Sequence, residues 1–320
     1  MAVYTEIDDD ALIAFIADYG IGEVLSCKGI AEGIENSNFI VTTTTGPYIL
    51  TLYEKRVKIE DLPFFLGLMD HLAAHGIPCP VPLRTRGGET LRELAGRPAA
   101  LVSYLAGMWP KRPTAEHCRH VGDALARFHL AGEGFSIRRD NALGVSAWRG
   151  LLDACGDFAD DVQTGLFAHL DETLEKIAAD WPSGLPFGVI HADLFPDNVF
   201  FRQQHLSGVI DFYFACRDFY AYDIAICLNA WCFEPDLSFN ITKARRFLAG
   251  YQAARPLEPL EIQALPVLAQ GAALRFLLTR LYDWLNTPDE AFVTPKNPIE
   301  YIRKLEFHLQ VKGPQSYGFD

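Results

Sequence analysis

Positive charge is scarce in this 320-residue sequence, which has 28 Lys and Arg residues against 41 Asp and Glu and a formal net charge of −13. Nucleic acids and anionic lipid surfaces are bound non-specifically through clusters of basic residues. The composition therefore argues against both kinds of partner. It does not exclude an anionic small molecule, because local donors, helix N-termini or a metal ion can hold such a ligand.

Targeting and membrane-spanning signals are also lacking. The opening MAVYTEIDDDALIAFIADYG is acidic where a secretory signal peptide is basic. No uninterrupted apolar run approaches the roughly 18 residues of a membrane helix. The seven cysteines are odd in number and include no C-x-x-C pair, and several lie in apolar stretches. We therefore expect a cytoplasmic protein with reduced, buried thiols.

The composition that remains is typical of a folded globular protein, with 49% hydrophobic and 22% charged residues. At this length a single core tends to divide, so we expect two lobes. Segment 34–53 is rich in Thr, Ile, Val and Tyr and is split by a turn at 45–47, which predicts a β-hairpin. In this first part we also expect helices at 8–20 and 61–76 and a last strand at 98–105.

After Gly107 the apolar residues recur three and four positions apart, which indicates helices. Thr114 has a side chain suited to cap the first of them. Further helices are predicted at 145–180, 223–233, 241–254 and 260–285. Strands followed by helices favour an α+β fold.

A polar stretch lies between two segments of buried character: IHADLFPDNVFF at 190–201 is followed by IDF at 210–212. Buried polar groups need internal partners or a ligand. VFF and GVIDF predict two short strands, which would bring Asp193, Asn198 and Asp211 to the mouth of one hairpin. Oxygen ligands of this kind suit Mg²⁺. Asp193 would then face a hydroxyl nucleophile.

This order of Asp, Asn and Asp is that of protein-kinase-type phosphotransferases, and the loop resembles those of aminoglycoside phosphotransferases and choline kinases. Across residues 1–310 the chain resembles bacterial homoserine kinases of the second, kinase-like type, in the phrases GIENSNF, YILTLYEKR, LPFFLGLMDHLAAHGIPCP, HCRHVGDALARFH, VIHADLFPDNVFF, IDFYFACRDFYAYDIA and ALRFLLTRLYDW. The resemblance implies a two-lobed protein-kinase-like fold. Its small β-rich N-terminal lobe would span 1–102, the hinge 103–107, and the larger, mainly helical C-terminal lobe 108–320.

The resemblance also implies a reaction. ATP would phosphorylate the side-chain hydroxyl of L-homoserine with Mg²⁺ as cofactor, a step of threonine biosynthesis. Asp193 would be the catalytic base, Asn198 and Asp211 the magnesium ligands, and His191 a brace for the loop. Asp223 is expected to cap an apolar helix and to support the same loop.

For the nucleotide, Asn36, Ser37 and Asn38 are candidate donors to the phosphates, although the same residues would suit an ordinary hairpin entry. Thr51 stands where most relatives carry a lysine. Because side chains alternate along a strand, Lys55 shares its face and could supply the missing cation, or could lie solvated at the strand end.

Adenine is expected in the cleft between the lobes, bonded to the backbone from Ser103 to Leu105.

Homoserine carries an ammonium and a carboxylate, so its pocket needs one anionic and one cationic partner. Arg275 and Arg280 lie in an apolar stretch, where a buried arginine requires an anion. Either could bind the substrate carboxylate, or could instead pair with Asp218 or Asp283. Asp218 or Tyr213 could meet the ammonium.

Three alternatives remain open at this point. The first is a kinase for another small alcohol such as choline, methylthioribose or an amino sugar. The second is a metal-dependent hydrolase that uses His191, Asp193 and Asp211 as ligands, although the sequence lacks a histidine cluster with ligand spacing. The third is a nucleotide-binding module without catalysis, suggested by the absent strand lysine.

Overall fold

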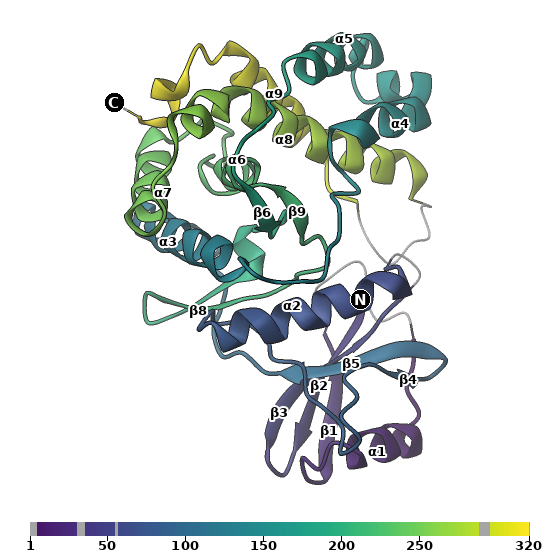
Figure 1. Cartoon of the computed structure of the whole chain (residues 1–320). Coiled ribbons are helices and arrows are strands. Elements are labelled where there is room, and N and C mark those ends of the chain that lie inside the picture. The colour runs from purple at the N-terminus through teal and green to yellow at the C-terminus, as the bar shows by residue number, and fades with distance from the viewer. Residues whose placement is uncertain (1–4, 31–35, 55–56, 288–294, 320) are drawn as a thin grey trace. The chain divides into compact units, whose positions relative to one another are not determined.

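The computed structural model describes residues 5–30, 36–54, 57–287 and 295–319 (Figure 1). The chain divides into two compact units. Unit 1 comprises Met1–Gly107, Phe135–Ile137 and Ser207–Tyr213, and unit 2 comprises Met108–Gly134, Arg138–Leu206 and Phe214–Asp320. All residues from 108 on were expected in the C-terminal lobe, whereas the structure groups Phe135–Ile137 and Ser207–Tyr213 with unit 1.

Unit 1 is built on a five-stranded antiparallel sheet with the strand order β1-β2-β3-β5-β4. The strands are β1 (Val24–Gly29), β2 (Ser37–Thr43), β3 (Gly46–Leu52), β4 (Arg92–Leu94) and β5 (Arg97–Ser103). The predicted hairpin is confirmed, because Thr43 pairs with Gly46 across a tight turn. The edge strands β1 and β4 were not predicted, since neither has a long run of β-branched residues.

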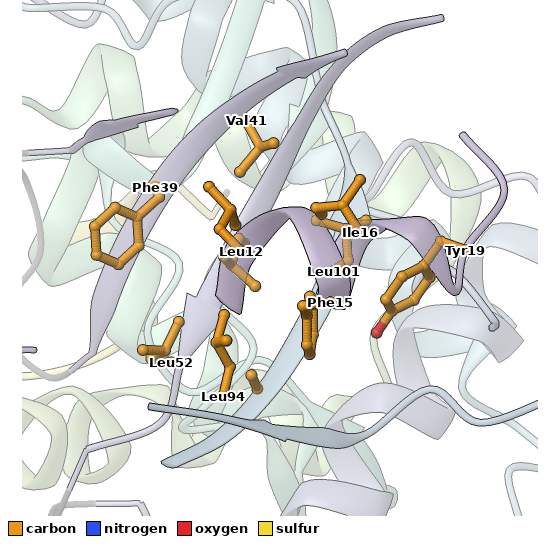
Figure 2. Close-up of a cluster of buried hydrophobic side chains, with 11 residues drawn as sticks. Leu12, Phe15, Ile16, Tyr19, Phe39, Val41, Leu52, Leu94 and Leu101 are labelled. Carbon is orange, nitrogen blue, oxygen red and sulfur yellow. The ribbon is translucent and has the colours of Figure 1, made fainter. Parts of the chain in front are cut away.

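Helix α1 (Asp9–Ala17) covers part of this sheet. The Asp8 side chain accepts a hydrogen bond from the N–H of Ala11, which is the expected N-cap. Figure 2 shows the apolar stripe of α1 facing side chains from the sheet. The buried cluster consists of Leu12, Phe15, Ile16, Tyr19, Phe39, Val41, Leu50, Leu52, Leu94, Ala99 and Leu101. Burial of one such large apolar side chain contributes about 1.5–3 kcal/mol.

A short 3₁₀ turn, η1 (Ile59–Asp61), leads into helix α2 (Leu62–Ala74) of the same unit. Two aromatic residues near the start of α2 contact the two later segments of unit 1, Phe135–Ile137 and Ser207–Tyr213. The ring of Phe64 lies 5.4 Å from that of Phe135, and the ring of Phe65 lies 5.5 Å from that of Tyr213, both edge to face.

Unit 2 is mainly helical. Its helices are α3 (Ala115–Ala131), α4 (Val145–Cys155), α5 (Leu166–Ala179), α6 (Tyr220–Trp231), α7 (Ile241–Ala254), α8 (Pro259–Asn286) and α9 (Ile299–Gln310), with 3₁₀ turns η2 (Gly156–Asp161), η3 (Pro196–Asn198) and η4 (Pro314–Tyr317). Strand β6 (Phe187–Ile190) pairs with β9 (Cys216–Phe219), and β7 (Val199–Arg202) pairs with β8 (His205–Val209), of which only the first two residues belong to unit 2.

Most helix predictions in unit 2 are confirmed, including the Thr114 cap and the bounds of α7. The single helical region predicted at 145–180 is wrong, because α4 ends where Gly156 takes a positive φ of 52° and α5 begins ten residues later at Leu166. Helix α9 was not predicted.

Two glycines allow helices α3 and α7 to pack closely. A Cβ on Gly122 would lie 2.0 Å from the carbonyl oxygen of Phe247, and a Cβ on Gly250 would lie 2.1 Å from that of Arg119. Atoms cannot approach so closely, so this packing requires glycine at both positions.

Within the described ranges, α8 is the one helix long and apolar enough to cross a membrane, and 61% of the tested window is buried inside the protein. The core helix of a folded protein meets the same test, so the cytoplasmic location stays a prediction. All seven cysteines are free thiols and, apart from the half-buried Cys27, all are buried.

Candidate active site

The loop that follows β6 is held in an unusual conformation. His191 is fully buried, and Ala192 has a φ of 62°, in the left-handed region that non-glycine residues seldom adopt. The Asp223 carboxylate fixes this turn: Oδ2 accepts the N–H of His191 at 2.7 Å, and Oδ1 accepts the N–H of Ala192 at 3.0 Å. The strained turn is thus tied to helix α6.

Asp223 was expected to cap α6, and this is wrong. The N-cap is Phe219, and Asp223 lies inside the first turn with none of its surface exposed. Its carboxylate is taken by the loop amides and by Nε2 of His129, which lies 3.1 Å from Oδ2. The expected support of the loop by Asp223 is therefore made through hydrogen bonds to the loop backbone.

His129 is an interior imidazole with a hydrogen-bond partner at each ring nitrogen. Burial lowers its pKa, although the hydrogen bond to Asp223 opposes this. Since Nε2–H donates to a carboxylate, Nδ1 of the neutral ring accepts the Tyr251 hydroxyl at 2.7 Å. Arg255 donates to the same hydroxyl at 3.2 Å and to Glu261 at 3.0 Å. A buried chain of polar contacts therefore runs from α8 through α7 and α3 to the loop.

Asp193 and Asn198 are brought together within unit 2. The N–H of Asp193 donates to Nδ1 of His191 at 3.3 Å, and the bracing role of this histidine stays a prediction. Nδ2 of Asn198 donates to the Asp193 carbonyl at 2.8 Å and to its Oδ2 at 3.2 Å. Both bonds use the amide nitrogen, and within the described ranges no hydrogen bond engages Oδ1 of Asn198. That oxygen is a ligand type that Mg²⁺ accepts, so the residue fits the predicted metal role.

Asp211 belongs to unit 1 and has a φ of 65°. Nearby in the chain, the Tyr213 hydroxyl lies 3.3 Å from that of Tyr53, and their rings meet edge to face. These contacts connect the segment after Asp211 with the end of β3. The convergence of Asp211 with Asp193 and Asn198 stays a prediction.

Arg275 of helix α8 lies beside the predicted base. Its Nη1 is 4.0 Å from Oδ1 of Asp193, and its side chain is 5% exposed. The guanidinium carbon lies 3.9 Å from the ring centre of Phe276 and 5.2 Å from that of Phe214, which are cation–π contacts.

Arg280, the other candidate on α8, has an internal partner. Its Nη1 lies 2.6 Å from Glu300, which also pairs with Lys304 at 2.7 Å. Burial alone would raise the pKa of Glu300, but the charges of Lys304 and Arg280 outweigh it and lower the pKa to about 2. Arg280 therefore already has an anionic partner, which it shares with Lys304 and which the sequence pattern did not indicate.

Asp218, the candidate partner of the substrate ammonium, accepts a hydrogen bond from Asn141 at 2.7 Å and one from the N–H of Phe219. Burial raises its pKa, against the opposing effect of these two bonds. Its role toward a substrate stays a prediction.

The candidate phosphate donors have partners inside unit 1. The Ser37 hydroxyl donates to Glu54 at 2.7 Å, and Oδ1 of Asn36 accepts the N–H of Glu54 at 3.2 Å. Thr51 donates to Oδ1 of Asn38 at 2.7 Å. The threonine at the position of the usual lysine thus has a structural hydrogen bond. Contact of these side chains with phosphate stays a prediction, and Lys55 lies outside the described residues.

In the segment from Ser103 to Leu105, which is predicted to bind adenine, some backbone groups already form hydrogen bonds within the protein. Ser103 donates its N–H to the carbonyl of Val81, and its hydroxyl accepts the N–H of Val81, both at 2.9 Å. In the part of the chain that the structure describes, no hydrogen bond engages the N–H of Leu105. Of the two, Leu105 is therefore the residue whose amide suits a base, and its contact with adenine stays a prediction.

Comparison with known proteins identifies the family. A model of the phosphotransferase enzyme family matches residues 26–257. Homoserine kinase of Rhizobium johnstonii is 60% identical over 318 residues, 99% of each chain. Homoserine kinase of Bradyrhizobium diazoefficiens is 61% identical over 319 residues, 99% of this chain and 98% of the relative. The chain belongs to the homoserine kinase family.

Solved structures agree with the fold expected of this homoserine kinase family member. An amicoumacin kinase in complex with AMP-PNP and Ca²⁺ has a TM-score of 0.73 at 16% identity, covering 98% of this chain and 96% of that one. A spectinomycin phosphotransferase has a TM-score of 0.67 at 14% identity, covering 97% of both. The predicted α+β kinase-like fold is confirmed.

Several residues near the loop that carries Asp193 were not identified from the sequence. Tyr251, Phe214 and Tyr301 were not singled out. Their contacts join residues from 25 to 122 positions apart, and no local motif encodes such contacts.

Proposed function

We propose that this protein transfers the γ-phosphoryl group of ATP to the side-chain hydroxyl of L-homoserine and forms O-phospho-L-homoserine. The observation that carries the proposal is 60% identity to a curated homoserine kinase over 99% of both chains. The arrangement of Asp193, Asn198 and Arg275 supports it, because these residues supply a base, a metal ligand and a cation near one another.

In this proposal Asp193 orients the substrate hydroxyl and accepts its proton. The loop that carries Asp193 is fixed by His191, Asn198 and Asp223 before any substrate arrives. Pre-organisation of this kind supplies most of the acceleration in phosphoryl transfer, which leaves the protein little covalent work.

Oδ1 of Asn198 and the carboxylate of Asp211 would hold Mg²⁺. When bound, this ion neutralises negative charge on the phosphate oxygens. The proposal for Asp211 depends on its place in the sequence motif, whereas that for Asn198 is supported by the orientation of its amide.

Of the two candidate arginines, Arg275 is favoured for the substrate carboxylate, because Glu300 already compensates Arg280. Asp218 and Tyr213 remain the proposed partners of the ammonium. Asn36, Ser37, Asn38, Lys55, Ser103 and Leu105 remain the proposed nucleotide residues.

A substrate panel tests the function. ADP release is coupled to a spectroscopic assay with L-homoserine, choline, methylthioribose and an amino sugar, each with ATP and Mg²⁺. We expect the highest kcat/KM for L-homoserine. A higher value for another alcohol would refute the proposed substrate, and thermal stabilisation by ATP without any product would favour the nucleotide-binding module.

An Asp211→Ala variant tests the metal assignment. We expect its turnover to fall to background while the wild-type protein, prepared in parallel, stays active. Survival of activity with Mg²⁺ present would refute the role of Asp211. Hydrolysis without ATP would mark the hydrolase alternative, but within the described residues no group of three His, Cys, Asp or Glu side chains could hold a metal ion.

A further inference from the structure

The hydroxyl of Tyr301 is buried without a hydrogen-bond partner. Within the described ranges only four buried side-chain oxygens lack one: those of Tyr19, Ser207, Tyr222 and Tyr301. Tyr301 lies in α9 with none of its surface exposed. A buried polar group without a partner costs free energy, so its presence calls for an explanation such as an absent ligand.

Tyr301 is connected to the predicted base by three successive contacts, all within unit 2. Its ring centre lies 5.3 Å from that of Phe276. Phe276 in turn packs against the guanidinium of Arg275 at 3.9 Å, and Nη1 of Arg275 lies 4.0 Å from Asp193. The ring of Tyr301 is thus two side chains away from the predicted base, and the charges of Asp193 and Arg275 both act on its hydroxyl.

Arg275 is also short of partners. Its guanidinium has five N–H donors, yet in the described chain its one ion pair is the 4.0 Å contact with Asp193, which is too long for a hydrogen bond. An arginine side chain that is only 5% exposed needs an anion. A carboxylate fits best, because its two oxygens match the planar fork of the guanidinium.

The phenol of Tyr301 is a hydrogen-bond donor at neutral pH. Burial raises its pKa far above the usual value, and the negative charges of Glu300 and Asp193 add to this against the opposing charges of Arg280 and Arg275. Arg280 and Lys304 lie over its ring, 4.4 and 4.6 Å from the centre. Both cations are paired with Glu300, so neither is available to a substrate.

We propose that Tyr301 acts with Arg275 as a carboxylate subsite for the acceptor, in which Arg275 supplies the charge and the Tyr301 hydroxyl donates a further hydrogen bond. The subsite selects alcohols that carry a carboxylate. This inference rests on the proposed function, since it names the part of L-homoserine that the enzyme recognises.

The first test uses the wild-type protein and two acceptors. The second acceptor is 3-amino-1-propanol, which is L-homoserine with its carboxylate replaced by hydrogen and which keeps the hydroxyl and the ammonium. We expect kcat/KM for aminopropanol to be at least a hundredfold below that for L-homoserine. Equal values would overturn the subsite, whereas failure to phosphorylate L-homoserine at all would refute the proposed function itself.

The second test is Tyr301→Phe, with Tyr19→Phe as the matched control because both remove an unpartnered buried hydroxyl. For Tyr301→Phe we expect KM for L-homoserine to rise about tenfold, the effect of losing one hydrogen bond, with kcat within twofold and KM for ATP unchanged. Its thermal midpoint without ligand should equal or exceed that of the wild type. Tyr19→Phe should change none of the kinetic constants.

Two results would overturn the role of Tyr301. One is a KM for L-homoserine within twofold of the wild-type value in Tyr301→Phe. The other is a clear loss of stability in the ligand-free variant, since this would mean that the hydroxyl already has a partner in the folded chain. An equal loss for aminopropanol and L-homoserine would likewise contradict recognition of the carboxylate.

Discussion

Replacement of Asp223 by Asn should weaken the loop that carries Asp193 without changing the size of the side chain. The carboxylate accepts three hydrogen bonds: Oδ2 accepts those of His191 N–H and His129 Nε2–H, and Oδ1 accepts that of Ala192 N–H. In the Asp223→Asn variant one of these oxygens becomes an NH₂ group, which accepts none. At least one of the donors then faces another donor in a fully buried place.

The magnitude follows from counting these bonds. His129 can restore its contact by changing tautomer, because the Tyr251 hydroxyl on its other nitrogen both donates and accepts. Whichever oxygen becomes the NH₂ group, one loop amide, that of His191 or that of Ala192, loses its charged acceptor. A bond to a charged group contributes about 1.5–3 kcal/mol, and a buried donor without a partner costs about 1–3 kcal/mol. We therefore expect a loss of about 2–4 kcal/mol in the free energy of unfolding, and a kcat at least tenfold lower because the turn at His191 and Ala192 is less firmly held.

The assay is urea unfolding at neutral pH followed by tryptophan fluorescence, together with kcat from coupled ADP release. Asp70→Asn is the control, because its carboxylate is partly exposed and pairs with the exposed Arg84. Such a surface pair contributes at most about 1 kcal/mol. If Asp223→Asn lost no more stability than Asp70→Asn and kept its kcat, the reasoning about the loop would be refuted.

Two further predictions concern unit 2. Gly122→Ala should lower the free energy of unfolding by more than about 3 kcal/mol, because its Cβ would lie 2.0 Å from a backbone oxygen of α7. Gly150→Ala should raise the free energy of unfolding by about 0.5–1 kcal/mol, because no atom lies within 4 Å of the added Cβ. Urea titration of both variants checks these two values. Burial lowers the pKa of His308 from 6.5 to about 3, so the unfolded chain takes up the proton first as pH falls. The free energy of unfolding should therefore decrease below pH 6.5, by up to about 1.4 kcal/mol per pH unit from this residue, and His308→Gln should show a shallower dependence across the same acidic range.

Features with a local physical cause were predictable from the sequence. Thr114 begins α3 because its hydroxyl accepts the N–H of His117, and that bond needs residues only three positions apart. The hairpin belongs to the same class, although its turn lies at Thr44 and Thr45 and not at 45–47, and so does the apolar spacing of α7. Helix α9 was missed although a start signal is present, since Asn297 and Pro298 precede it and the Asn297 side chain accepts the N–H of Ile299.

The site was predictable only as far as its motif reaches. The pairing of Asp193 with Asn198 follows from five residues of one loop. The role of Asp223 depends on hydrogen bonds across 31 and 32 residues, and these exist only once α6 packs beneath the loop. In the sequence, Asp223 directly precedes an apolar stretch, so a role as helix N-cap is the simplest interpretation. In the folded chain the Asp223 carboxylate instead accepts hydrogen bonds from the loop amides of His191 and Ala192.

Transfer of a labelled γ-phosphoryl group from ATP to L-homoserine, followed in a single turnover with Mg²⁺, tests the central claim most directly. The wild-type protein should place the label on the homoserine side-chain oxygen, and Asp193→Asn should do so about 10²–10⁴ times more slowly while it still binds ATP. Label that stays on ATP in the wild type, or an Asp193→Asn rate equal to the wild-type rate, would contradict the account.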